Sequence, residues 1–324
     1  MNIRKILKYL FSAALASVLL WFSFRDVEWD TFWAELGKCR WEFILLSMVA
    51  GATAFWVRGL RWRQLLLPLD DSISRMTAFN GINIGNISNF VFPRIGEFVR
   101  CGVIVRRSRS VTYDKVLGTV ILERGWELLV MLLMLAIVLV AGFDRYGGFV
   151  VENIWTPLSQ RFGSGLWLIV AGVAVLIPSA IYLLWRMREK NGFCGKVWSV
   201  LRGIGQGFAS CMKMDRKWLF FAYTLLIWML YWLMAASTMW AAPFLAELTL
   251  VDALFLSLVG GLGFAVPAPG GIGSFHFVIS LALLGVYGVP METGVIYATL
   301  SHTSQAITQI IFGAGSYAYE TLKK

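Results

Sequence analysis

The sequence predicts an all-α fold: a polytopic membrane helix bundle with two re-entrant helical hairpins in an inverted-repeat arrangement. Hydrophobic residues make up 58% of the 324 residues and charged residues only 15%, whereas soluble domains average about 25% charged residues. Several apolar runs approach the roughly 20 residues that a helix needs to cross a bilayer. Basic residues gather in blocks between these runs, as they do in cytoplasmic loops. We therefore expect one transmembrane domain over residues 1–324.

The first apolar run, residues 5–24, follows a basic start, as in a signal peptide. Its small-residue cleavage candidate, Ala14 to Ala16, lies inside the run, so we expect an uncleaved first helix. The net charge of +10 comes from basic blocks in loops, which argues against nucleic acid as a partner. The four cysteines lack a metal-ligand spacing, and we expect neither a metal nor another cofactor.

The charge pattern predicts a first hairpin. Residues 58–75 and 100–115 are both strongly basic, hence both cytoplasmic, although the apolar run 73–92 separates them. That run therefore enters the membrane and returns, as a re-entrant hairpin over residues 73–107 with its turn near Asn86 to Arg94. The runs expected to cross the membrane completely are 5–24, 41–57, 116–142, 165–185, 218–241 and 292–318.

A second hairpin follows from the same argument. Run 218–241 leaves the cytoplasm and run 292–318 returns to it, so the two runs between them, 251–266 and 273–289, start and finish outside. We expect a re-entrant hairpin over residues 251–289, with the stretch VPAPGGIGSF at its turn. Non-helical backbone at this depth must be buried in protein or line a wet cavity.

The two hairpins belong to units of opposite orientation, residues 41–142 and 218–318, with both chain termini cytoplasmic. Ile95-Gly96-Glu97-Phe98 and Ile272-Gly273-Ser274-Phe275 share three of four residues at the two turns. Inverted repeats with broken helices are common in secondary transporters. The connecting segment 143–217 contains a predicted interfacial amphipathic helix at 194–213, for which a solvated loop is the alternative.

The two turns form the first part of a candidate site. After Pro93, and again after Pro269-Gly270-Gly271, the returning limb starts a helix, near Gly96 and Gly273. Two positive helix ends then converge near the middle of the membrane beside Arg94, which suits a negatively charged group such as a phosphate. Alternatively, Arg94 and Glu97 pair with each other and only stabilise the turn.

Three charged residues, Glu123, Arg124 and Glu127, interrupt the apolar run 116–142. Arg124 lies roughly 12 Å into the run at 1.5 Å per residue, so it should face the bundle interior and have partners. Arg124 and Glu127 can pair three residues apart, which leaves Glu123 free to meet Arg94 or Arg100. We expect a functional polar network, with a purely structural one as the alternative.

Further polar residues complete the candidate site. His302 and Gln305 share one face of the last helix, and His276 follows the second turn. For the histidines, interhelical hydrogen bonding and a proton-linked role are the alternatives. Arg58 and Arg61 either anchor the chain at the membrane interface or gather anionic headgroups. The remaining two candidates, Asn86 and Asn89, belong to the first turn.

Four motifs occur in a fixed order along the chain: Arg58-x-x-Arg61-Trp62, Asn86 through Pro93-Arg94-x-Gly96-Glu97-x-x-Arg100, Glu123-Arg124, and Pro269-Gly270-Gly271-x-Gly273. In order and spacing they resemble the lysylphosphatidylglycerol synthase transmembrane region, a flippase-like family of bacterial and archaeal lipid-pathway proteins. The resemblance implies a protein of the bacterial or archaeal cytoplasmic membrane. It also implies movement of a membrane phospholipid or polyprenyl-linked lipid between the leaflets.

Two positions depart from the family pattern. The family tends to have Asp where Glu127 stands, and it often has an acidic residue near His276. Family members that synthesise aminoacylated lipid carry an additional soluble domain. Because the chain ends at Lys324, just beyond its last apolar run, we expect the transmembrane region to stand alone.

We therefore expect a flippase-like transporter of an anionic or phosphate-bearing lipid, and not an enzyme. A membrane glycosyltransferase that uses polyprenyl-phosphate sugars is one alternative, but its catalytic residues need more than external loops of about 10 to 20 residues. A proton-coupled small-solute carrier is another, because an inverted repeat suits it equally well. The headgroup, the direction, the energy source and the oligomeric state, a homo-oligomer included, stay open.

Overall fold

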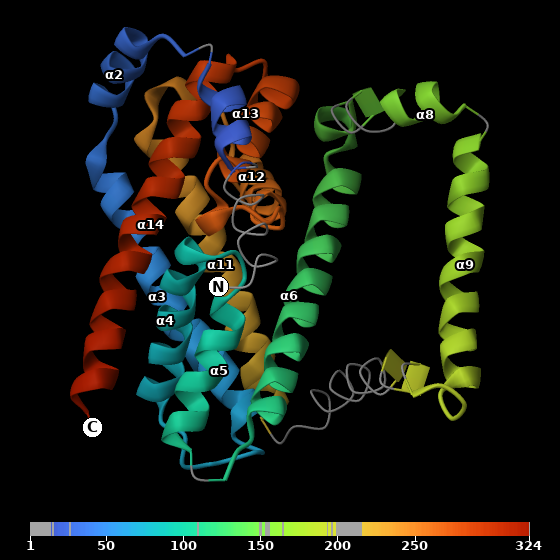
Figure 1. Ribbon diagram of the computed structural model, residues 1–324. Helices are drawn as coiled ribbons and strands as arrows, with labels where there is room; N and C mark the ends of the chain where they lie inside the picture. Colours follow the sequence, from blue (N-terminus) through green and yellow to red (C-terminus); the bar gives the residue numbers. More distant parts are fainter. Residues whose placement is uncertain are drawn as a thin grey trace.

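The computed structural model describes residues 14, 16–25, 27–108, 110–148, 151–152, 156–163, 165–192, 194–195, 197–198 and 216–323. These residues form helices and turns, with no strand among them (Figure 1). The helices between the N-terminal segment and the middle of the chain are α2 (Trp29–Gly37), α3 (Trp41–Leu66), α4 (Arg75–Val91), α5 (Gly96–Arg107), α6 (Tyr113–Ala141), the π-helix η1 (Phe143–Gly147), α8 (Thr156–Phe162) and α9 (Gly165–Met187). The C-terminal part contains α11 (Lys217–Ala241), the 3-10 turns η3 (Pro243–Leu245) and η4 (Pro269–Gly271), α12 (Leu250–Gly263), α13 (Ser274–Tyr287) and α14 (Met291–Leu322).

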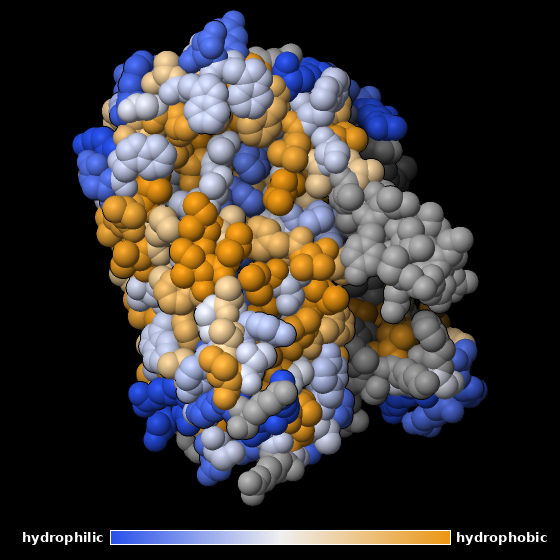
Figure 2. Space-filling model, turned by 60° about the vertical axis from the view of Figure 1, so that its left-hand side comes forward, coloured by the Kyte–Doolittle hydropathy of each residue, from blue (hydrophilic) through white to orange (hydrophobic). Residues whose placement is uncertain are grey.

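Within the described residues, four segments are long and apolar enough to cross a membrane: α3, α6, α11 and Pro269–Tyr287, which joins η4 to α13. Figure 2 shows a band of hydrophobic side chains across the middle of the molecule, with hydrophilic residues at both ends. Large apolar side chains on α6, such as Leu128, Leu132 and Leu133, are exposed, which suits contact with lipid. The chain is a multi-pass membrane protein.

The first helical hairpin consists of α4 and α5, which lie in one half of the bundle (Figure 1). Ser74 caps α4 by accepting a hydrogen bond from the Thr77 amide (3.0 Å). The two limbs approach closely, because a Cβ added to Gly96 would lie 2.0 Å from the Gly85 carbonyl oxygen. At about 1.5 Å per residue, neither limb is long enough to cross the roughly 30 Å hydrocarbon core.

The loops at the two ends of the first hairpin lie together. Ser108 and Ser72 both donate hydrogen bonds to the Asp70 carboxylate. These bonds lower the pKa of Asp70, because they stabilise its charged form. The base of the hairpin is also tied to the end of α14, where Glu320 binds Arg107 (2.6 Å) and Asn80 (2.7 Å).

The second helical hairpin, α12 and α13, lies in the opposite half of the bundle (Figure 1). Thr249 and Asp252 form a capping box at the start of α12. The buried Asp252 carboxylate also accepts hydrogen bonds from Tyr146 (2.8 Å) and Tyr287 (3.0 Å) and pairs with Arg145 (3.1 Å). These contacts hold the base of α12 and α13 against the end of α6.

The turns of the two hairpins meet inside the bundle. Arg94 in the first turn donates a hydrogen bond to the Ala265 carbonyl oxygen in the second (2.9 Å). A Cβ added to Gly270 would lie 2.5 Å from the Phe90 ring. In the second turn Gly270, Gly271 and Gly273 all have positive φ (59°, 75° and 83°), a backbone conformation that glycine adopts at little cost.

Most predicted apolar runs coincide with helices within a few residues, but one boundary was wrong. The sequence ended a run at residue 57, whereas α3 continues to Leu66 and places Arg58 and Arg61 inside a helix, buried in the protein. Most of the predicted amphipathic helix, 194–213, lies outside the described residues, as does the start of the first run. Helix α9 stands apart from the other helices (Figure 1).

Candidate functional site

A cavity of about 600 Å³ lies where the two hairpin turns meet. One wall carries charged residues, and the remainder combines neutral polar groups with aromatic and aliphatic side chains. The polar and charged lining residues include Arg58, Asn86, Asn89, Arg94, Glu97, Arg100, Arg124, Glu127, Ser301, His302, Gln305 and Gln309. The apolar lining includes Phe55, Met131, Trp228, Leu256, Phe264 and Phe275.

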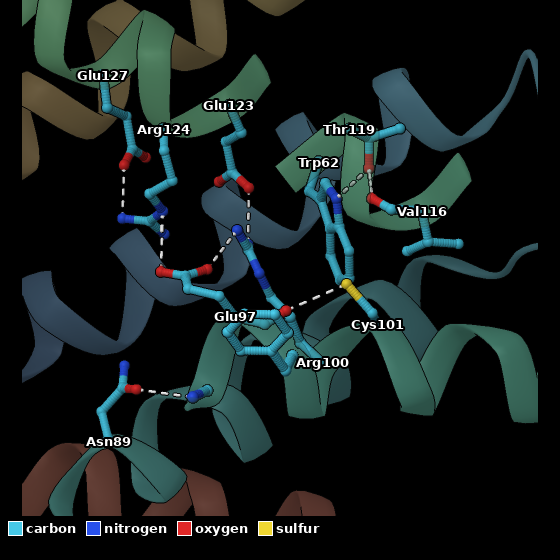
Figure 3. A network of polar contacts seen from close by, with 12 residues as sticks. Trp62, Asn89, Glu97, Arg100, Cys101, Val116, Thr119, Glu123, Arg124 and Glu127 are labelled. Carbon is cyan, nitrogen blue, oxygen red and sulfur yellow. Dashed lines mark hydrogen bonds and ion pairs between the residues drawn. The ribbon is translucent and has the colours of Figure 1, made fainter. Parts of the chain in front are cut away.

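Six residues on the charged side form a closed cycle of alternating charges, here called the charge ring: Arg61, Glu123, Arg100, Glu97, Arg124 and Glu127. Each arginine pairs with two glutamates, and each glutamate with two arginines. The contacts are Arg61–Glu123 (3.1 Å), Glu123–Arg100 (2.6 Å), Arg100–Glu97 (2.8 Å), Glu97–Arg124 (3.1 Å), Arg124–Glu127 (2.8 Å) and Glu127–Arg61. Figure 3 shows the part of the ring formed by Glu97, Arg100, Glu123, Arg124 and Glu127.

The charge ring connects three helices and has a buried and an open side. Arg61 comes from α3, two members come from α5, and the other three come from α6. The side chains of Arg61, Arg100 and Glu123 are at most 2% exposed, whereas that of Arg124 is 39% exposed. Three positive and three negative charges cancel within the ring, which lowers the cost of burying them inside the protein.

Aromatic contacts support the buried side of the ring. The Arg100 guanidinium lies 4.7 Å from the centre of the Trp62 ring, an arrangement that stabilises a cation. Trp62 in turn donates a hydrogen bond from Nε1 to Thr119 Oγ1 (3.0 Å). Arg61 lies 5.8 Å from the centre of the Phe220 ring. The buried arginines are therefore held by stacking as well as by charge.

The structure agrees with two expected pairings and disagrees with one. Arg124 pairs with Glu127, as the helical spacing predicted, and Glu123 pairs with Arg100, one of its two predicted partners. Glu97 pairs with Arg100 and Arg124, and it forms no ion pair with Arg94. The alternative in which Arg94 and Glu97 stabilise the turn as a pair was wrong.

Arg94 is the one non-glycine residue with positive φ (62°) in the part of the chain that the structure describes. This left-handed backbone costs a non-glycine residue roughly 1–2 kcal/mol. Such strain persists where the surrounding structure enforces it, and it is concentrated at functional sites. The exposed Arg94 side chain lines the cavity and reaches the second hairpin through Ala265.

Arg58 is a second arginine that lines the cavity outside the charge ring. Its side chain belongs to α3, one helical turn before Arg61, and the residue is only 9% exposed. Among the described residues no carboxylate lies within ion-pair distance of Arg58, and its buried Nε has no hydrogen-bond partner. Its environment therefore differs from that of the three ring arginines.

The N-terminal end of α5 lacks the free backbone amide groups that the sequence predicted there. The Gly96 amide donates to Asn89 Oδ1 (2.8 Å), and the Phe98 and Val99 amides donate to the Ile95 carbonyl oxygen (3.0 Å each). The opening amides of α5 thus have partners within the chain. Gly96 contributes close packing against Gly85, and Asn89 orders the turn.

Only some of the site residues predicted in and just after the second turn line the cavity. Gly270 and Gly271 line the cavity, whereas Pro269, Gly273 and His276 are not among its lining residues. Gly273 packs against the N-terminal helical segment, since a Cβ there would lie 2.6 Å from the Ala16 carbonyl oxygen. The His276 side chain is buried in the protein.

Neutral polar groups line the other side of the cavity. His302 Nε2 lies 2.9 Å from the Gly270 carbonyl oxygen, and the His302 and His276 rings are 5.0 Å apart. Gln305 donates to Ser47 Oγ (3.2 Å). Among the described residues, Asn86 Nδ2 is buried without a hydrogen-bond partner. Sequence reasoning left Ser301 and Tyr231 out of the site, because single hydroxyl groups in apolar helices carry no recognisable signal.

Arg58 and Arg94 give the cavity two guanidinium groups that can bind an anion. In the described part of the chain no group of three His, Cys, Asp or Glu residues could hold a metal ion.

The family model described as "Lysylphosphatidylglycerol synthase TM region" matches residues 7–313. No curated protein and no solved structure matches the chain significantly.

Proposed function

The chain belongs to the lysylphosphatidylglycerol synthase transmembrane-region family, and from this premise we propose that it carries a lipid with an anionic or phosphate-bearing headgroup between the leaflets of the bilayer. The observation that carries the proposal is the cavity between the hairpin turns, which Arg58 and Arg94 line without a carboxylate partner in the described chain. Phospholipids and polyprenyl-linked lipids both have such headgroups. The role is that of a transporter and not of an enzyme.

The cavity offers both environments that a lipid headgroup needs. Its volume of about 600 Å³ falls within the usual 300–1,000 Å³ of small-molecule pockets. Arginine side chains bind phosphate oxygens through several donors at once, and the apolar lining suits the first carbons of the acyl chains. The exposed apolar face of α6 leaves the remaining acyl chain in contact with the bilayer.

The two hairpin turns would act as the gates on either side of the headgroup. Arg94 and Ala265 join the turns in this structure, so opening the cavity requires that this hydrogen bond break. The proposal treats both hairpins as re-entrant and the units 41–142 and 218–318 as an inverted repeat. Movement of one unit against the other would then expose the cavity to each leaflet in turn.

The proposed topology places the protein in the cytoplasmic membrane of a bacterium or archaeon with both termini in the cytoplasm. Single cysteines at Asp71 and Ser110, in a chain without native cysteines, should react with an impermeant thiol reagent from the cytoplasmic side. Those at Glu247 and Glu292 should react from the other side. The short limbs of the hairpins motivate this expectation. Labelling of Asp71→Cys and Ser110→Cys from opposite sides would contradict it.

Substitution of Arg94 tests the transport proposal. Arg94→Asn should lower the initial rate of translocation of fluorescent phosphatidylglycerol in proteoliposomes by at least about tenfold, because hydrogen bonds to a charged group contribute about 1.5–3 kcal/mol. Asparagine tolerates positive φ, so the loss reports the guanidinium group and not backbone strain.

Two variants accompany this measurement. Arg94→Lys retains the charge and should recover part of the rate. Arg106→Asn removes an exposed arginine at the other end of α5 and should leave the rate unchanged. Transport at the wild-type rate by a folded Arg94→Asn protein would rule out the proposed role of Arg94.

A further inference from the structure

The charged residues at the cavity do not balance. Five arginines (Arg58, Arg61, Arg94, Arg100 and Arg124) face three glutamates (Glu97, Glu123 and Glu127) in the cavity lining and the ring behind it. The charge ring contains three members of each kind and is neutral. The remaining two positive charges belong to Arg58 and Arg94.

Neither of these arginines forms an ion pair with another described residue. Arg58 is more than nine-tenths buried, with an unpartnered Nε. Arg94 makes one hydrogen bond, to an uncharged carbonyl oxygen. A charge without a partner is costly within a membrane, and the three arginines of the charge ring are each paired with two glutamates. The two unpaired arginines are therefore available to a ligand.

We propose that the cavity takes a lipid headgroup with two negative charges, a phosphomonoester or a diphosphate, and that Arg58 and Arg94 neutralise it. A phosphodiester headgroup such as that of phosphatidylglycerol carries one negative charge and would leave one arginine uncompensated. The inference rests on the proposed function and narrows its substrate class. Asn86 Nδ2, a buried donor without a partner, supplies a further hydrogen bond for a phosphate oxygen.

Binding of two lipids with identical acyl chains tests the inference. The probes are dioleoyl phosphatidic acid and dioleoyl phosphatidylglycerol, each titrated into the purified full chain in a non-ionic detergent at pH 5 and pH 8. A phosphomonoester gains its second negative charge near pH 6, while phosphatidylglycerol keeps a single charge. Native mass spectrometry measures both dissociation constants, with phosphatidylethanolamine as the background lipid.

Phosphatidic acid should bind at least about tenfold more tightly at pH 8 than at pH 5. Phosphatidylglycerol should change by less than about threefold, since it gains no charge. Groups of the protein that face the cavity, namely Glu97, Glu127, Arg100, Arg124 and His302, affect both lipids, so the comparison of the lipids removes their contribution. Arg58→Gln and Arg94→Gln should each abolish most of the preference for phosphatidic acid. Arg58→Lys and the exposed-site control Arg106→Gln should retain it.

Three results would overturn the inference. Equal binding of the two lipids at both pH values refutes the two-charge headgroup but leaves transport of an anionic lipid standing. Binding of neither lipid above phosphatidylethanolamine refutes the proposed function as well. Competition by inorganic phosphate at the concentrations where phosphatidic acid binds assigns the site to a soluble anion instead of a lipid. If Arg58→Gln fails to fold, the wild-type comparison at two pH values still decides.

Discussion

Glutamine in place of Glu123 is expected to lower the free energy of unfolding by about 3–5 kcal/mol, the usual cost of removing one partner of a buried ion pair. The Glu123 side chain is 0% exposed, and its two oxygens bind Arg61 (3.1 Å) and Arg100 (2.6 Å). The variant leaves three arginines with two glutamates in the ring, and the side chains of Arg61 and Arg100 are at most 2% exposed. Unfolding in mixed micelles titrated with sodium dodecyl sulfate measures the change.

A matched control and a double variant distinguish the ring from a general effect of the substitution. Asp114→Asn removes an exposed carboxylate from the first turn of the same helix and should change stability by no more than about 0.5 kcal/mol. Glu123→Gln combined with Arg100→Gln leaves a balanced chain of two arginines and two glutamates. The double variant should therefore lose about 1–3 kcal/mol less than the two single losses combined. Strict additivity would contradict a ring that acts as one unit.

Alanine in place of Gly96 is expected to displace the first hairpin turn and to abolish transport. Its Cβ would lie 2.0 Å from the Gly85 carbonyl oxygen and 2.8 Å from Asn89 Oδ1. The first of these is a backbone atom, so α4 and α5 must separate to relieve the overlap. Overpacking of this kind costs about 1–3 kcal/mol or more. Separation also moves Arg94, two residues earlier, away from the cavity. The same unfolding titration and the fluorescent-lipid assay measure both effects.

The same helix provides the control for Gly96. A Cβ added to Gly102 meets nothing within 4 Å, and alanine is favoured over glycine inside a helix by about 1 kcal/mol. Gly102→Ala should therefore be as stable as the wild type or slightly more stable, with full transport. Wild-type behaviour of Gly96→Ala would show that the turn does not need the close approach of its two limbs.

Much of the helical architecture follows from hydropathy and charge. The limbs of the two hairpins were predicted at residues 73–92, 251–266 and 273–289, close to α4, α12 and α13. Proline, glycine and charged residues bound these runs, and the helices end near these positions. The end of α3 was not predictable in this way. Hydropathy falls at Arg58, but the helix continues because its arginines are buried against other helices.

The charge ring shows where local spacing stops being informative. Arg124 and Glu127, or Glu97 and Arg100, lie three residues apart, so one helical turn brings each pair together. Arg61 and Glu123 are 62 residues apart, and they meet only because α3 packs against α6. No pattern within either helix encodes that contact.

Arg94 illustrates both what the sequence alone determines and what only the tertiary structure determines. Its place after Pro93, at the break between two apolar limbs, could be read from the residues alone, because proline and glycine end a helix through their own backbone geometry. Its left-handed backbone, its bond to Ala265 and its lack of a carboxylate partner depend on how the second hairpin meets the first. Short-range chemistry sets where the chain turns. The identity of the partner groups at that turn depends on the packing of segments more than 150 residues apart, here 171 residues for Arg94 and Ala265.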